Sequence, residues 1–282
     1  MEKKFLPPAV ALLGGAAGYA LRRWQLSAGF EPDTGLAIPG APSAIALMAC
    51  TLVVALLAAA LCWKWQGKSQ CPVSFAWVKG NTLYAAAAAV AGILFLVGAV
   101  AEVPTLAQTM AQARTGDNLL VRAAGRVLPP ARVALGVLAA PCAILWGRAV
   151  YRGDKDGMKE NLGLLELCLL FCVCLVSDYQ KHSADPVTMN YAYEVLAMVC
   201  VLLALYYLAG YSFQEGKPRR CLFFCLMGCY FCLVALADWG DLPRMLDYGA
   251  AAIFLLAHAV ALRSVPAPLT GSAKEEGEAQ HG

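Results

Sequence analysis

The sequence predicts an all-α fold, a polytopic bundle of about eight transmembrane helices with both termini in the cytoplasm. Three observations predict this class. Of the 282 residues, 60% are apolar and only 15% are charged, whereas a soluble domain has about 25% charged residues. The apolar residues gather in stretches close to the roughly 20 residues that cross a bilayer. None of these stretches alternates with the period of two that a membrane β-barrel requires.

Eight stretches fit this description with different margins. The second, third, fourth and sixth are long and apolar, while the other four lie at the short end of the range of about 17–25 residues. Tryptophans and tyrosines flank the stretches, which is typical of anchors at the membrane interface. In order, the predicted spans are Phe5–Leu21, Ser43–Trp63, Thr82–Ala101, Pro129–Ala149, Leu162–Ser177, Asn190–Tyr211, Cys221–Ala237 and Leu246–Leu262.

The basic residues of the short loops predict the orientation. With the N-terminus in the cytoplasm, most of the 22 lysines and arginines lie on the cytoplasmic side, as the positive-inside rule requires. A cluster of Arg122, Arg126 and Arg132 lies on the outer side and disagrees. We expect Leu119–Leu128 to be a short amphipathic segment in the membrane interface, where its arginines meet lipid phosphates. Binding of an anionic ligand is the alternative.

The Arg22-Arg23 pair also falls on the outer side and allows a second interpretation of the first span. Met1–Ala20 has the basic start, apolar run and small residues of a cleaved signal peptide. Removal of that segment would leave seven spans and an outer N-terminus, with every later loop on the same side. Cleavage just before Leu21 and two arginines would be unusual, so we expect a retained helix.

The bundle is expected to occupy residues 1–263, followed by a disordered cytoplasmic tail at 264–282 that is rich in polar residues, glycine and proline. Every loop is shorter than about 30 residues, whereas a folded domain needs about 50. Phosphate-binding loops and the HExxH and GxSxG motifs are absent. The net charge of +3 is too small to indicate a nucleic-acid partner. We therefore predict no catalytic residues, and a non-enzyme is favoured over an enzyme.

The first loop and the helix before it carry a recognisable pattern, which consists of Leu13–Gly18, Arg22–Leu26, Phe30–Leu36 and Pro39–Pro42. This pattern resembles uncharacterised multi-span membrane proteins of Clostridia-type gut bacteria. The resemblance covers roughly the first 45 residues, brings no activity, and implies a bacterial cytoplasmic membrane. Arg22, Arg23, Glu31 and Asp33 are the outer-loop candidates. Their pairing could hold the loop over the bundle, although exposed ion pairs are weak; a binding role is the alternative.

Twelve cysteines are present, and four of them share one face of the seventh span. Cys221, Cys225, Cys229 and Cys232 recur at helical spacing, and thiolates bind soft metals. One helix, however, cannot surround a metal with ligands spread over three turns. Cysteine is also small and apolar, which favours close helix packing. We expect packing, and neither a metal nor another cofactor.

Ionisable residues inside spans are the candidates for binding a substrate or an ion, because burying charge in a bilayer is costly. Glu166 lies in the fifth span, Glu194 in the sixth and His258 in the eighth. Glu166 could instead pair with Lys159 or Arg152 near the surface. His258 is more often a residue that packs in the bundle with a hydrogen bond to a backbone carbonyl.

Aspartates also recur in the predicted outer loops. We expect them to be ordinary solvated residues, and the alternative is an acidic vestibule that attracts cations. These residues are Asp178, Asp185, Asp238, Asp241 and Asp247.

Pro141 lies in the middle of the fourth span, where a missing backbone N–H should kink the helix and provide a hinge. Together with the intramembrane charges and the span count, it favours a small-solute or ion permease, or a membrane subunit of a transport system. The second hypothesis is a non-catalytic membrane scaffold or regulator that binds a protein partner through its basic cytoplasmic loops. An intramembrane enzyme acting on lipids is a third, and it lacks the expected cluster of acids or histidines.

Overall fold

The computed structural model describes residues 2–31, 36–64, 79–112, 119–152, 158–182, 191–211, 217–238 and 240–263. Within these ranges the chain is helical apart from turns and one backbone bridge between Phe30 and Ala37, which confirms the all-α class. The predicted tail at 264–282 lies outside them. The helices are α1 (Glu2–Ala28), α2 (Pro42–Lys64), α3 (Thr82–Gln112), α4 (Leu119–Arg152), α5 (Met158–His182), α6 (Ala192–Gly210), α7 (Pro218–Ala235) and α8 (Leu242–Arg263).

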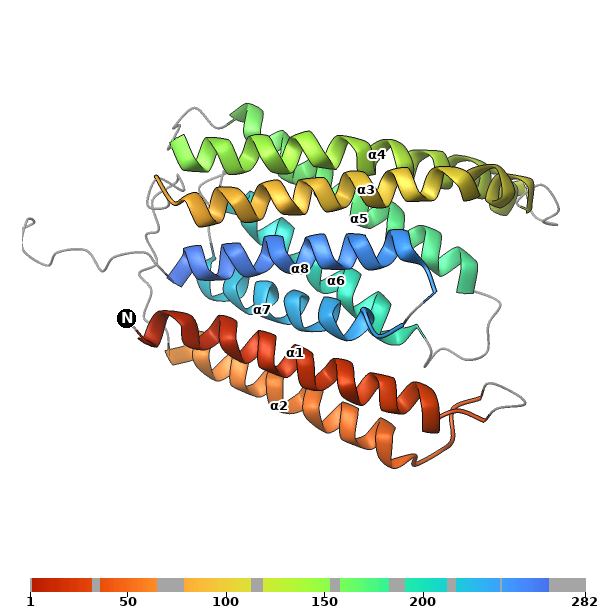
Figure 1. Ribbon diagram of the computed structural model, residues 1–282, viewed down its shortest axis with the longest axis horizontal. Coiled ribbons are helices and arrows are strands. Elements are labelled where there is room, and N and C mark those ends of the chain that lie inside the picture. Colours follow the sequence, from red (N-terminus) through yellow and green to blue (C-terminus); the bar gives the residue numbers. More distant parts are fainter. Residues whose placement is uncertain are drawn as a thin grey trace, which may run out of the picture.

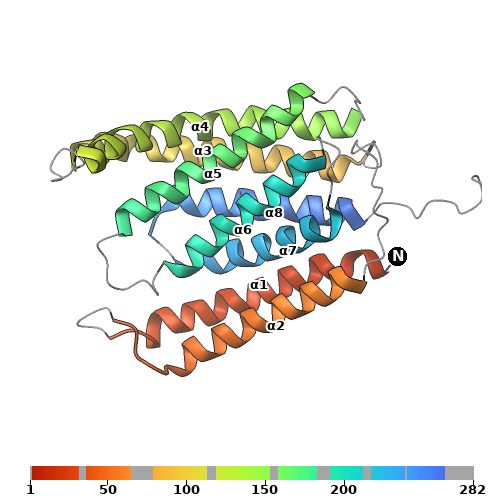
Figure 2. The same ribbon diagram turned by 180° about the vertical axis from the view of Figure 1, so that it is seen from behind.

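Seven of these eight helices, all but α1, are long and apolar enough to cross a membrane. Successive helices run in opposite directions, so α1 begins and α8 ends at the same end of the bundle (Figures 1 and 2). Helices α3 to α8 form a closed ring in which each contacts the next and α8 contacts α3. The hairpin of α1 and α2 packs on the outside of this ring, mainly against α7.

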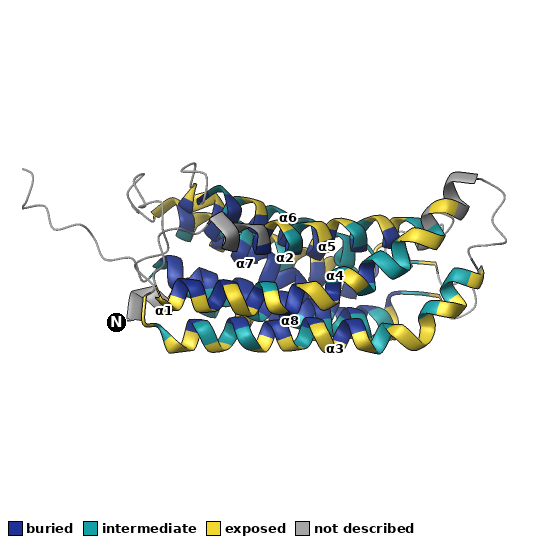
Figure 3. Cartoon of the chain, turned by 90° about the horizontal axis from the view of Figure 1, so that it is seen from above, coloured by how far each residue is buried: buried dark blue, intermediate teal, exposed yellow. Residues whose placement is uncertain are grey.

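Burial follows this arrangement, with exposed residues along the outer faces of the helices and buried residues toward the interior (Figure 3). In the apolar span of α7, 72% of the residues are buried, whereas in that of α2 only 22% are. The difference arises because α7 contacts both the ring and the hairpin. Leu52, Leu56 and Trp63 are among the large apolar side chains that α2 leaves uncovered. Such a face fits contact with lipid chains.

Several helices extend past the ends of the predicted spans. Leu119–Leu128 is not a separate short segment, because these residues form the first turns of the continuous helix α4. Its location in the membrane interface stays a prediction. Helix α3 continues to Gln112, α5 to His182, and α8 begins at Leu242. Glu102, Asp178 and Arg244, which lie next to the apolar windows, are therefore held on helices rather than in loops.

Helix α1 is attached to its neighbours through glycines. A Cβ atom on Gly15 would lie 2.4 Å from Leu233 of α7, and one on Gly18 would lie 2.6 Å from Val234. The helices therefore approach more closely here than any side chain would allow. Helix α1 also runs unbroken past Ala20, where the alternative interpretation of the first span placed a cleavage site.

Candidate functional site

Three arginines form ion pairs toward the end of the bundle opposite the start of α1. Arg22 comes from α1, Arg132 from α4 and Arg244 from α8, and all three are buried. Their carboxylate partners come from α3, α5, α6, α8 and the loops that flank α7 and α8. Six helices (α1, α3, α4, α5, α6 and α8) thus contribute a charged residue to this set, and α7 ends just before Asp238.

Arg22 lies inside the bundle rather than in the outer loop. Its side chain is 0% exposed, and Nε donates a 2.9 Å hydrogen bond to Oδ1 of Asp238. Its Nη1 donates to Oε1 of Gln25 at 2.9 Å, and the guanidinium carbon lies 5.3 Å from the ring centre of Tyr193. The expectation that Arg22 acts from an exposed loop is therefore wrong. Of its two expected partners, Glu31 is an exposed residue after the end of α1, and Asp33 lies outside the described residues.

Asp238 follows the end of α7 and has two different oxygens. Oδ1 accepts the hydrogen bond from Arg22, whereas Oδ2 is buried and has no hydrogen-bond partner within the described ranges. Burial raises the pKa of this carboxyl group above its usual range, and the nearby Arg22 guanidinium opposes that rise. An acceptor in this state would gain from a donor that enters from outside.

Arg244 is shared by three carboxylates. It forms a close ion pair with Asp178, and its Nη1 donates to Oε2 of Glu194 at 3.0 Å. Its Nε lies 3.0 Å from Oδ2 of Asp241. Three potential negative charges thus surround one positive charge, in a place where the arginine side chain is only 11% exposed.

Arg132, on α4, completes the set of buried arginines. Its Nη2 donates to Oδ2 of Asp247 at 3.0 Å, and its Nε lies 3.2 Å from Oε2 of Glu102. Ionised partners of this kind compensate each other's loss of hydration, which allows these charges to be buried. The ion pairs connect α4 with α3 and α8.

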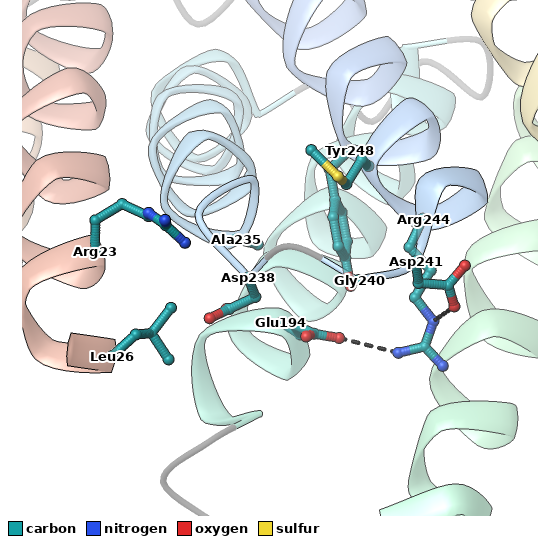
Figure 4. Close-up of a pocket in the computed structure, with 10 residues that line it drawn as sticks. Arg23, Leu26, Glu194, Ala235, Asp238, Gly240, Asp241, Arg244 and Tyr248 are labelled. Atoms are coloured by element: carbon teal, nitrogen blue, oxygen red, sulfur yellow. Dashed lines mark hydrogen bonds and ion pairs between the residues drawn. The ribbon is translucent and has the colours of Figure 1, made fainter. Parts of the chain in front are cut away.

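A pocket of about 430 Å³ opens among these charges. Residues of α1, α6, α8, the end of α7 and the connection from α7 to α8 line it. Figure 4 shows the carboxylates of Asp238 and Glu194 between α1 on one side and α8 on the other. The described lining consists of Arg23, Leu26, Glu194, Ala235, Asp238, Gly240, Asp241, Arg244, Met245 and Tyr248. The pocket combines charges of both signs with an apolar surface.

The expectation that the outer aspartates are ordinary solvated residues is wrong for Asp178 and Asp247, which are buried and paired. Asp241 is more open, with 42% of its side chain exposed. Asp185 lies outside the described residues. Of the residues singled out from sequence, Arg22, Arg23, Glu194 and four of the five outer aspartates meet at this end of the bundle. Arg132 joins them through carboxylates rather than through the expected lipid phosphates, and the roles of Arg244 and Glu102 were missed.

Glu166 lies apart from this site on α5. Both of its carboxylate oxygens are buried, and neither accepts a hydrogen bond from a nitrogen or oxygen donor within the described part of the chain. The neighbouring group is the Cys142 thiol of α4, close to the point where Gly163 packs against Cys142. The side chain of Lys159, one of its two expected partners, is not among those described.

His258 is held in a compact set of hydrogen bonds between α3, α4 and α8. Its Nδ1 lies 2.8 Å from the backbone oxygen of Phe254, which can only accept, so this nitrogen carries the proton. Nε2 is then the acceptor for the Tyr84 hydroxyl at 2.7 Å, and Trp146 donates to the same hydroxyl at 2.9 Å. The hydrogen bond from His258 to a backbone oxygen agrees with the expectation that His258 packs inside the bundle. The set lies about 20 Å from Arg244 along α8.

The four cysteines of α7 are all buried within the apolar core. Among the residues that the structure describes, no three His, Cys, Asp or Glu side chains come together in a way that could hold a metal ion. Pro141 lies within α4, which continues unbroken through it. Its role as a hinge stays a prediction.

The helices and their apolar surfaces define a multi-pass integral membrane protein. No protein-family model matches the chain, and no match was found among curated proteins or solved structures. The assignment of a function therefore depends on the residues of the site alone.

Proposed function

We propose that the protein is a small-solute permease, or the membrane subunit of one, in a bacterial cytoplasmic membrane. The observation that carries this proposal is the pocket of about 430 Å³ among buried charges at one end of the bundle. This volume is within the range of about 300–1,000 Å³ that small-molecule sites occupy. Charged residues in a membrane bundle are costly and commonly mark the path of a substrate or an ion.

The ion pairs give such a permease a means of closing one end. Arg22, Arg132 and Arg244 fasten neighbouring helices there, and the pairs can exchange partners without exposing a bare charge to lipid. Between this end and His258 the ring is filled by apolar side chains. Passage of a solute would therefore require the helices to separate, and the hinge predicted at Pro141 would allow α4 to bend.

Flux into reconstituted vesicles tests the proposal. The purified protein is placed in liposomes, and uptake is measured for a panel of organic cations, amino acids, carboxylates and alkali ions. We expect saturable uptake of at least one class. Glu194→Gln should reduce that uptake at least about tenfold, because it removes a charge from the pocket while retaining the size of the side chain.

Glu102→Gln is the matched control for this test. Glu102 belongs to the same set of ion pairs but does not line the pocket, and Arg132 keeps Asp247 as a partner when Glu102 is changed. Uptake should therefore fall far less than it does in Glu194→Gln. Folded protein without flux for any class of solute would contradict the permease and leave the membrane scaffold as the better hypothesis.

A further inference from the structure

We propose that the pocket binds a ligand carrying an ammonium group on a short apolar body. This inference builds on the proposed permease by naming its solute class, although binding can be measured without transport. It depends on three properties of the pocket: the balance of charge, an unused acceptor, and the chemistry of the remaining walls.

The balance of charge favours a cation. Among the described residues, Arg244 is the cation that forms ion pairs with Glu194 and Asp241, and it shares its charge with Asp178 as well. One shared guanidinium cannot neutralise both Glu194 and Asp241, and like charges so close together repel strongly in a partly buried site. A second cation in the pocket would restore the balance, because Glu194 and Asp241 both face it.

Arg23 also lines the pocket and contributes a positive charge near Asp238. It is an exposed residue of α1, and its Nη1 lies 3.5 Å from the backbone oxygen of Ala237. Because Arg23 is exposed to solvent, its charge is screened more strongly than the charges of the buried acids. The interior of the pocket therefore remains the more acidic part.

Asp238 lines the pocket, and the unused acceptor is its buried Oδ2, which has no hydrogen-bond partner within the described ranges. Carboxylate oxygens only accept, so the missing partner must be a donor. A primary ammonium group has three donors. It could therefore donate to both Asp238 and Glu194, which line the pocket and lie between Arg23 and Arg244 in Figure 4.

The remaining walls are apolar and favour an organic cation over a metal ion. Leu26, Ala235, Met245 and the ring of Tyr248 supply surface for a hydrocarbon body, and an aromatic face attracts cations. A volume of about 430 Å³ is far more than a bare ion needs. The described residues also offer no group of three ligands that could hold a metal ion.

Two sources could supply this chemistry in a membrane. One is a free amine in solution, and the other is the ethanolamine headgroup of a phospholipid, because the pocket lies near one end of the helices. Both present an ammonium group beside apolar carbon. The experiment therefore includes an arm for each.

Binding is measured by calorimetry on the detergent-solubilised full chain in an amine-free phosphate buffer, with phenethylamine as the probe. Phenylacetate and 2-phenylethanol serve as controls, because they keep the phenyl group and replace the ammonium with a carboxylate or a hydroxyl. We expect saturable binding of phenethylamine, and none of the controls at the same concentrations. Equal binding of 2-phenylethanol, or no binding of phenethylamine, would overturn the inference.

Variants separate the pocket from non-specific attraction. Glu194→Gln and Asp241→Asn should each weaken phenethylamine binding at least about tenfold, the size expected for one charge-assisted hydrogen bond. Asp241→Asn is the safer variant for folding, because its side chain is 42% exposed and Arg244 keeps two other carboxylates. Glu102→Gln should bind as the unaltered protein does, and an equal loss there would overturn the assignment to this pocket.

The lipid arm compares nanodiscs of phosphatidylethanolamine with nanodiscs of phosphatidylcholine, which has the same net charge but no N–H donor in its headgroup. Weaker phenethylamine binding in phosphatidylethanolamine supports the ammonium site with the lipid headgroup as its occupant, whereas equal binding supports it with a free amine. Failure of the permease remains distinguishable. Binding without flux would contradict only the permease, while flux of another solute without amine binding would contradict only the ammonium site.

Discussion

Arg22 and Arg23 are adjacent in the chain and have opposite environments. Arg22 is completely buried and pairs with Asp238, whereas Arg23 is exposed at the pocket. The sequence alone shows only two arginines after an apolar run. Their different roles depend on which face of α1 meets α7, and that is fixed by the glycines and side chains of the contact between them.

This difference predicts unequal effects on stability. Arg22→Gln leaves Asp238 buried without its cation and should cost about 3–5 kcal/mol of the free energy of unfolding, the usual result of breaking a buried ion pair. Arg23→Gln should cost about 0–1 kcal/mol, as for surface charges. Unfolding by sodium dodecyl sulfate in mixed micelles measures both. Similar losses for the two variants would mean that Arg22 is not buried against Asp238.

Helices were predictable from apolar content, and their ends were not. The apolar windows stop where charged residues begin, so Glu102 and Asp178 were assigned to loops. In the structure α3 and α5 continue through them, because each carboxylate meets an arginine from another helix. Pairing across helices removes the cost that would otherwise end a span. A single sequence contains no information on which helices adjoin, so these pairs and the pocket between them could not be inferred.

Close packing of α3 against α4 is a second property of these elements, and it can be tested with one methyl group. A Cβ atom on Gly147 would lie 2.6 Å from the Cβ atom of Ala88, a contact that no side-chain rotation can relieve. Gly147→Ala should therefore force the helices apart and cost about 1–3 kcal/mol of the free energy of unfolding. The same mixed-micelle titration measures the loss.

Gly249→Ala provides the matched control. Gly249 lies in α8, and a Cβ atom built on it meets nothing within 4 Å. Alanine there should be neutral or should add up to about 1 kcal/mol, because glycine is the poorer helix former. If both substitutions lowered stability equally, the contact between α3 and α4 would not be as close as the structure describes.

At the scale of the whole molecule, the ring of α3 to α8 and the outer hairpin of α1 and α2 give an even number of antiparallel helices. The apolar content of the sequence accounts for the membrane class and for most of the helices. It does not account for the closure of the ring, which depends on contacts between α3 and α8, far apart in the chain. Whether α1 crosses the bilayer decides where the N-terminus lies relative to the pocket.

The sidedness of three positions settles that question. Epitope tags are placed at the N-terminus, at the exposed Gly40 turn between α1 and α2, and at the C-terminus, and antibody binding is compared in intact and permeabilised bacterial spheroplasts. With eight spans we expect only the Gly40 tag to bind in intact cells, because both ends of the chain then lie in the cytoplasm. Binding of the N-terminal tag as well would mean that α1 lies on the outer side without crossing. Loss of that tag from the mature protein would instead identify a cleaved segment and place the charged pocket beside a new, outer N-terminus.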